Sequence, residues 1–173
     1  MQNKSYSFPV VFWGEEKSTK VTFNISEKPP KEQSAITSVM CAVFKDNKIL
    51  LVKPKRGWGL PGGHVEKNES PQDALKRECL EEADAEIKNI KLIGYWETNK
   101  IIELESNRQY PDRGYQLLFM ADLEKLHSFK KRFEVDARRF ASPEEIAALH
   151  HNYANVEEIL RYILDVKLAN IHA

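Results

Sequence analysis

Three glutamates crowd one face of a predicted helix near the middle of the chain. Glu78, Glu81 and Glu82 stand three and four residues apart, a spacing that makes side chains neighbours on a helix surface. Like charges at these spacings repel each other, which favours a bound cation over a solvated acidic face that binds nothing. Clustered carboxylate oxygens suit Mg²⁺ or Mn²⁺ rather than Zn²⁺. The residues therefore predict a magnesium site, with Mn²⁺ as the other candidate ion.

The segment before these glutamates supplies a turn and a helix start. Residues 58–63, Trp-Gly-Leu-Pro-Gly-Gly, are a glycine-rich run whose backbone can approach a ligand closely. Ser70 is a good N-cap, Pro71 suits the first helical position, and Asp73 stands where a capping acid would. An apolar or small residue then recurs every four positions, which predicts a stripe buried against a sheet: Leu75, Cys79 and Ala83.

The turn and the helix together resemble the Nudix box, whose pattern is Gly-x5-Glu-x7-Arg-Glu-apolar-x-Glu-Glu-x-Gly-apolar. Asp84 stands where the family has glycine, and Ala85 is small for the final apolar position. Asp84 can adopt the left-handed conformation of a helix-ending glycine at some cost, so we expect a slightly perturbed helix end and an intact site. Six residues match the fixed positions of the pattern: Gly63, Glu69, Arg77, Glu78, Glu81 and Glu82.

The resemblance implies roles for the matching residues in metal binding and catalysis. Glu81 and Glu82 resemble the principal metal ligands of the family, and Glu78 resembles a ligand or the general base. The backbone carbonyl of Gly62 or Gly63 is expected to be a further ligand and to lie against the substrate. Which glutamate acts as the base varies within the family, so the resemblance does not choose among them.

The resemblance also implies a bracing pair and a later acid. Arg77 and Glu69 resemble the pair that holds the box together, since Arg77 can reach Glu69 or Glu81. A further carboxylate from a later loop often joins such a site. Glu134 is the first candidate for it, because an aromatic residue and a helix start follow, as in the family, and Asp112 is the second. A solvated strand charge is the equal alternative for Glu134.

Residues around the glycine run have weaker signals. The basic residues before it could meet phosphates or be ordinary turn charges: Lys53, Lys55 and Arg56. Trp58 is expected to pack under the loop. His64 is expected to be a hydrogen-bonded loop residue rather than a catalyst, and His150-His151 a favourable charge at a helix end. Four aromatic residues could stack on a base, although we expect at least two of them in the core: Tyr95, Trp96, Tyr110 and Tyr115.

Length and charge restrict the class of protein. The chain has 173 residues, enough for one domain with a real core. Lys and Arg number 26 and so do Asp and Glu, which argues against a general binder of nucleic acid or membranes. Cys41 and Cys79 lack a metal-binding spacing, so we expect reduced, structural thiols. No signal peptide or long apolar run is present, which predicts a cytoplasmic protein.

The coarse pattern predicts an α/β fold, and the resemblance implies a Nudix α/β/α sandwich with a mixed central sheet and an N-terminal β extension. Residues 1–34 are expected to form a β hairpin extension and a linker, and residues 35–173 the Nudix domain. The hairpin can join the main sheet or serve a partner surface. Strands are expected over 8–13, 20–25, 36–44, 48–53, 87–98, 114–121 and 133–140, with a basic loop over 125–132. Helices are expected from 71, over 142–151 and from an N-cap at Asn155.

The resemblance implies Mg²⁺-dependent hydrolysis of a nucleoside diphosphate linked to another group. A nucleoside triphosphate or an oxidised nucleotide is the first choice of substrate. ADP-ribose, dinucleoside polyphosphates and RNA 5′ ends are alternatives, although the neutral net charge disfavours long RNA. A nucleotide-binding regulatory module with weak catalysis is the alternative of another class. A homodimer that uses the edge of the hairpin is a further expectation.

Overall fold

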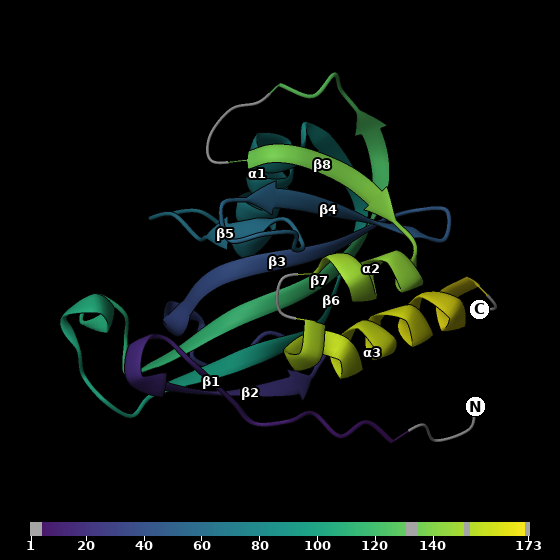
Figure 1. Ribbon diagram of the computed structural model, residues 1–173. Coiled ribbons are helices and arrows are strands. Elements are labelled where there is room, and N and C mark those ends of the chain that lie inside the picture. The colour runs from purple at the N-terminus through teal and green to yellow at the C-terminus, as the bar shows by residue number, and fades with distance from the viewer. Residues whose placement is uncertain (1–4, 131–134, 151–152, 172–173) are drawn as a thin grey trace.

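The computed structural model describes residues 5–130, 135–150 and 153–171, and within these ranges a single mixed sheet holds eight strands (Figure 1). The strand order is β1-β2-β6-β7-β3-β4-β8, with β5 paired to β3 off this path. β3 and β7 run parallel, and the other pairs are antiparallel. The strands are β1 (Val11–Trp13), β2 (Thr19–Ile25), β3 (Ile36–Lys45), β4 (Lys48–Pro54), β5 (Gly62–His64), β6 (Ala85–Lys100), β7 (Arg113–Leu126) and β8 (Val135–Ala141).

Helices cover both faces of the sheet (Figure 1), which confirms the expected α/β/α sandwich. α1 (Pro71–Ala83) packs on one face, and α2 (Pro143–Leu149) and α3 (Tyr153–Ile171) pack on the other. β3 is apolar from Val39 to Phe44, where it is covered on both sides, and successive side chains there alternate between the two cores. Val39, Cys41 and Val43 join the core under α1, whereas Ala42 and Phe44 join the core under the C-terminal helices.

The N-terminal hairpin is part of the main sheet. β1 pairs with β2, and β2 pairs with β6 over seven residues, from Thr19 opposite Lys100 to Ile25 opposite Gly94. Val21 is fully buried in the same core as the C-terminal helices. The hairpin therefore extends the sheet at its β6 edge, which answers the question that the sequence left open.

Several element boundaries differ from the expectation: β1 begins at Val11 rather than at 8, and β6 spans Ala85–Lys100 rather than 87–98. α3 already begins at Tyr153, so Asn155 lies inside the helix and does not cap it. α2 ends at Leu149 rather than at 151, and His150 is its C-cap. β7 continues to Leu126, into the segment expected to be a basic loop, because it pairs with β6 as far as Ala85 opposite Leu126. Among the residues that the structure describes, none of the helices is both long and apolar enough to cross a membrane.

The two ends of α1 show how the chain holds this helix. At its start the Ser70 hydroxyl accepts the N–H of Asp73 at 3.2 Å, as predicted. At its end Asp84 takes the left-handed conformation, with φ 46° and ψ 41°, and donates its N–H to the Leu80 carbonyl. The buried Asp84 carboxylate accepts the N–H of Lys130 at 2.8 Å. The aspartate thus adopts the backbone of the family glycine and gains a partner that glycine could not have.

Candidate active site

The glycine run lies directly on the acidic face of α1. β5 is fixed beside β3 by pairing Gly63 with Val39, so the loop cannot shift along the helix. Glu82 Oε2 accepts the backbone N–H of Gly62 at 2.9 Å. A Cβ atom built on Gly63 would lie 2.2 Å from Glu78 Oε1, which means that this carboxylate fills the space a larger residue would take. The two glycines therefore bring the backbone within reach of two carboxylates.

Arg77 ties the remaining box residues together. Its Nε and Nη2 atoms donate to the two oxygens of Glu69 at 2.9 and 3.0 Å. Nη1 donates to Glu78 at 2.9 Å and to Glu81 at 3.1 Å, and Nη2 also donates to the carbonyl of His64 at 2.9 Å. A planar guanidinium suits such divided contacts because its donors point in fixed directions. The expected bracing pair of Arg77 and Glu69 is present, and Arg77 reaches Glu81 as well.

Two carboxylates of the site, Glu78 and Glu82, have raised pKa values. Burial raises the pKa of Glu78, although Arg77 opposes this. Burial also raises the pKa of Glu82 to about 7, helped by the charge of Glu78 and opposed by the Gly62 N–H and the charge of Arg56. By contrast, the hydrogen bonds from Arg77 hold the pKa of Glu69 below its usual range. Glu78 and Glu82 are thus carboxylates whose ionised forms would gain from a cation.

A divalent ion fits this chemistry. The donors are oxygens only, as Mg²⁺ prefers, and the pKa values of the partly buried Glu78 and Glu82 are raised, which shows that nearby positive charge does not fully offset burial. Among the residues that the structure describes, no three acidic, His or Cys side chains converge as a ready-made metal site. Glu82, Glu78 and Glu81 would hold the ion, with the carbonyl of Gly63 as the predicted backbone ligand.

The structure places the other candidates less close to the box. Arg56 is exposed, and its charge acts on Glu82, so it lies near that carboxylate. Lys53 lies 6.0 Å from the ring centroid of Trp58, which is partly buried against the core as expected. Asp112 pairs with Lys100 at 3.2 Å and has an almost fully exposed side chain. Glu134 lies outside the described residues, so its role as a ligand stays a prediction.

The aromatic residues separate into core and surface groups. Trp96 and Tyr115 are each only 5% exposed and belong to the core, and Tyr95 packs edge-on against Tyr115 at 5.5 Å. Tyr110 is 41% exposed and stacks on His64, with ring centroids 6.0 Å apart and ring planes 12° apart. The expectation that at least two of the four aromatic residues are core residues is confirmed.

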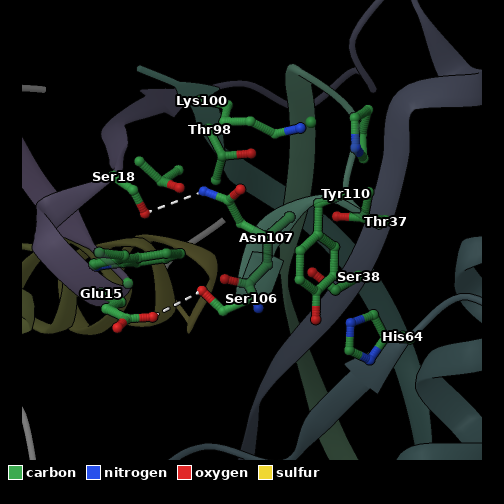
Figure 2. Close-up of a pocket in the computed structure, with 16 residues that line it drawn as sticks. Glu15, Ser18, Thr37, Ser38, His64, Thr98, Lys100, Ser106, Asn107 and Tyr110 are labelled. Atoms are coloured by element: carbon green, nitrogen blue, oxygen red, sulfur yellow. Dashed lines mark hydrogen bonds between the residues drawn. The ribbon is translucent and has the colours of Figure 1, made fainter. Parts of the chain in front are cut away.

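A pocket of about 360 Å³ opens beside His64, and no motif in the sequence predicted it. Its lining residues come from the N-terminal hairpin, from the strands β3, β6 and β7, and from the connection over 101–112 (Figure 2). The hairpin and the connection are distant in sequence and carry ordinary turn residues, so only their contact in the fold reveals the pocket. Residues that sequence reasoning missed include Glu15, Ser106 and Asn107.

Comparisons with known proteins place the box in a family. The model of the NUDIX domain matches residues 35–163, which is most of the chain. The Nudix hydrolase YvcI of Bacillus subtilis is 45% identical over 56 residues, covering 31% of this chain and 35% of YvcI. YtkD of the same organism, provisionally named an 8-oxo-dGTP diphosphatase, is 27% identical over 117 residues, 66% of each chain. The matched segments thus span about a third and just under two thirds of these relatives.

Solved structures agree on the fold. The crystal structure of a mutant form of the B. subtilis pyrophosphohydrolase BsRppH superimposes with a TM-score of 0.58. The match covers 75% of this chain and 76% of that protein at 23% sequence identity. Identity at this level supports a shared fold and leaves the substrate open.

Proposed function

The chain belongs to the Nudix family, and we propose that it is an enzyme that hydrolyses a phosphoric anhydride bond in a nucleotide with the help of Mg²⁺. The observation that carries the proposal is the seating of the glycine run on Glu78 and Glu82. It puts main-chain groups, two partly buried carboxylates and the nearby charge of Arg56 in one place. Such an arrangement suits a polyphosphate bridged by a hard cation.

The contacts of each box residue indicate its role in the proposed reaction. A bound Mg²⁺ would supply charge neutralisation at the diphosphate and a lowered pKa for water. The Gly62 N–H holds Glu82 in one orientation, so this carboxylate is set before any ligand arrives. Arg77 positions Glu69, Glu78 and Glu81 without needing to touch the substrate. Burial raises the pKa of both Glu78 and Glu82, so either carboxylate is a candidate general base.

A nucleoside triphosphate, canonical or oxidised, is the proposed substrate. The name of YtkD points to an oxidised guanine nucleotide, and this chain resembles YtkD over 117 residues. The alternatives are ADP-ribose, dinucleoside polyphosphates and RNA 5′ ends. They differ from the first choice in the group beyond the diphosphate and not in the reaction at phosphorus.

Product analysis with Mg²⁺ over a nucleotide panel tests the proposal. The panel contains canonical triphosphates, 8-oxo-dGTP, ADP-ribose, NADH, coenzyme A and a dinucleoside polyphosphate. We expect release of a nucleoside monophosphate and pyrophosphate from one triphosphate, far faster than any turnover of the others. Preferred cleavage of ADP-ribose or a dinucleoside polyphosphate would support the proposed hydrolysis and contradict the proposed substrate. Nucleotide binding with no turnover of any compound would contradict the enzyme and favour the regulatory module.

A further inference from the structure

The pocket beside His64 is closed by a part of the chain that the family match does not include. The matched region begins at residue 35, whereas Trp13, Gly14, Glu15, Ser18 and Thr19 line the pocket from the N-terminal hairpin. The connection over 101–112 lies beside the hairpin in the lining, and residues of β3, β6 and β7 complete it (Figure 2). Its volume, about 360 Å³, falls in the range of small-molecule sites.

Hydrogen bonds join the hairpin to the connection over 101–112. The buried Asn107 amide donates to the Ser18 hydroxyl at 3.1 Å and to the Ile102 carbonyl at 2.9 Å. The carbonyl of Ser18 accepts the backbone N–H of Ile101 at 2.8 Å. At the rim, the Ser106 hydroxyl donates to Glu15 at 3.1 Å (Figure 2). The pocket therefore has its shape before a ligand binds, which lowers the ordering cost of binding.

The lining selects a flat, uncharged, hydrogen-bonding group. Trp13 and the Tyr110–His64 pair supply aromatic surface. Lys100, which also lines the pocket, has an 8% exposed side chain and is already paired with Asp112, so it offers little to a phosphate. Hydroxyl and amide groups complete the lining, with Glu15 as a carboxylate acceptor: Ser18, Thr37, Ser38, Thr98, Ser106, Asn107 and Gln116.

His64 connects this pocket to the catalytic loop. It lines the pocket, its neighbour Gly63 lies against the Glu78 carboxylate, and its own carbonyl accepts a hydrogen bond from Arg77. A ligand whose diphosphate lies on the glycine run can therefore extend past His64 into the pocket. We propose that the pocket binds the nucleobase of the substrate, with the N-terminal hairpin and Tyr110 setting the base preference. This proposal rests on the proposed function, since it concerns the same substrate.

Equilibrium binding to the full chain in Mg²⁺ tests the pocket without requiring turnover. The probes are AMP, GMP, UMP and CMP, with ribose 5-phosphate as the probe that lacks a base. Stacking of one base on an aromatic residue predicts that the preferred nucleotide binds about tenfold or more tighter than ribose 5-phosphate. Equal binding of all five probes would overturn the proposal.

Variants of Tyr110 separate stacking from a general loss of structure. Tyr110→Ala should weaken the preferred nucleotide about tenfold and leave ribose 5-phosphate unchanged. Tyr110→Phe keeps the ring and should bind within about twofold of the wild type. Ile102→Ala is the matched control, because Ile102 is an apolar residue of the same connection, is as exposed as Tyr110 at 41%, and does not line the pocket. An unchanged base preference in Tyr110→Ala would contradict the assignment.

The outcomes distinguish this proposal from the proposed function. Base-selective binding without hydrolysis of any nucleotide would support the assignment of the pocket and contradict the proposed enzymatic activity. The opposite outcome is hydrolysis that does not discriminate among bases and that Tyr110→Ala leaves unchanged. It would support the proposed enzymatic activity and overturn the assignment of the pocket.

Discussion

Glu82 accepts a hydrogen bond from the backbone N–H of Gly62 at 2.9 Å, which joins the helix of the box to its loop. The bond makes one carboxylate both a structural contact and a candidate metal ligand. Burial raises its pKa to about 7, so the contact comes with an electrostatic cost for the ionised group. A glutamine amide at this position could accept the same hydrogen bond without that electrostatic cost. The change Glu82→Gln therefore separates the structural role of this residue from its candidate role as a metal ligand.

Glu82→Gln should remove activity and keep the fold. The amide oxygen can still accept the Gly62 N–H, but it no longer supplies negative charge to a metal ion. Since such an ion contributes several kcal/mol to the transition state, we expect kcat to fall about 100-fold or more. Tm should change by less than about 4 °C, the shift for roughly 1 kcal/mol in a domain of this size. A large drop in Tm would mean that Glu82 is mainly structural.

Changing Gly62 or Gly63 to alanine should damage the protein in different ways. At Gly62 a Cβ atom would lie 2.2 Å from the Val39 carbonyl oxygen and 2.8 Å from the Met40 Cα, both backbone atoms of β3. Gly62→Ala should therefore cost about 1–3 kcal/mol of stability. At Gly63 the obstacle is the mobile end of Glu78, so Gly63→Ala should keep its Tm and lose activity about tenfold or more by displacing that carboxylate. Thermal melts and turnover of both variants check this contrast, and equal losses of Tm would contradict it.

Arg77→Lys should show that the shape of this residue matters as well as its charge. Lysine keeps the positive charge but cannot hold both oxygens of Glu69 while contacting Glu78 and Glu81. Because Arg77 positions candidate metal ligands, we expect kcat/KM to fall about 10- to 100-fold, with a higher Mg²⁺ requirement. Lys76→Ala is the control, since Lys76 is exposed on the same helix. A wild-type Mg²⁺ titration for Arg77→Lys would refute the positioning role.

The sequence predicts the box well because its information is local. A cap, a buried stripe and a row of glutamates on one helix follow from spacing alone, and the structure confirms each of them. Asp84 also adopts the left-handed conformation that the pattern requires at that place. What the pattern could not show is the compensation at this residue, because the partner of its carboxylate, Lys130, lies 46 residues away.

Elements whose limits depend on distant partners were predicted less well. β7 continues through charged residues to Leu126 because the long pairing with β6 outweighs their weak preference for a loop. The start of α3 was misplaced because Asn155 is a common N-cap type that also tolerates a position inside a helix. The pocket beside His64 depends on Asn107 meeting Ser18 across 89 residues, a contact without any local sequence signal.

Asp122 gives a prediction about pH that is independent of the active site. Its carboxylate joins β7 to α3 through Lys167 at 2.6 Å and contacts the Asn89 amide at 2.9 Å. Burial raises the pKa of this carboxyl, but the hydrogen bonds from Lys167 and Asn89 outweigh burial and lower it overall. A pKa below the unfolded value means stability that is present above about pH 4 and is lost as the pH falls through the folded-state pKa.

Asp122→Asn should therefore lower Tm at pH 7 and lose that effect at low pH. Because the pair is partly exposed and screened, we expect a loss of at most about 1 kcal/mol, or about 4 °C or less. Melting both proteins between pH 7 and pH 3 should show the gap narrowing as the wild-type carboxyl takes up its proton. Asp136→Asn, which changes an exposed carboxylate on β8, should show no gap at neutral pH. A gap for Asp122→Asn that stays constant down to pH 3 would mean that the side chain stabilises the protein by packing and not through its charge.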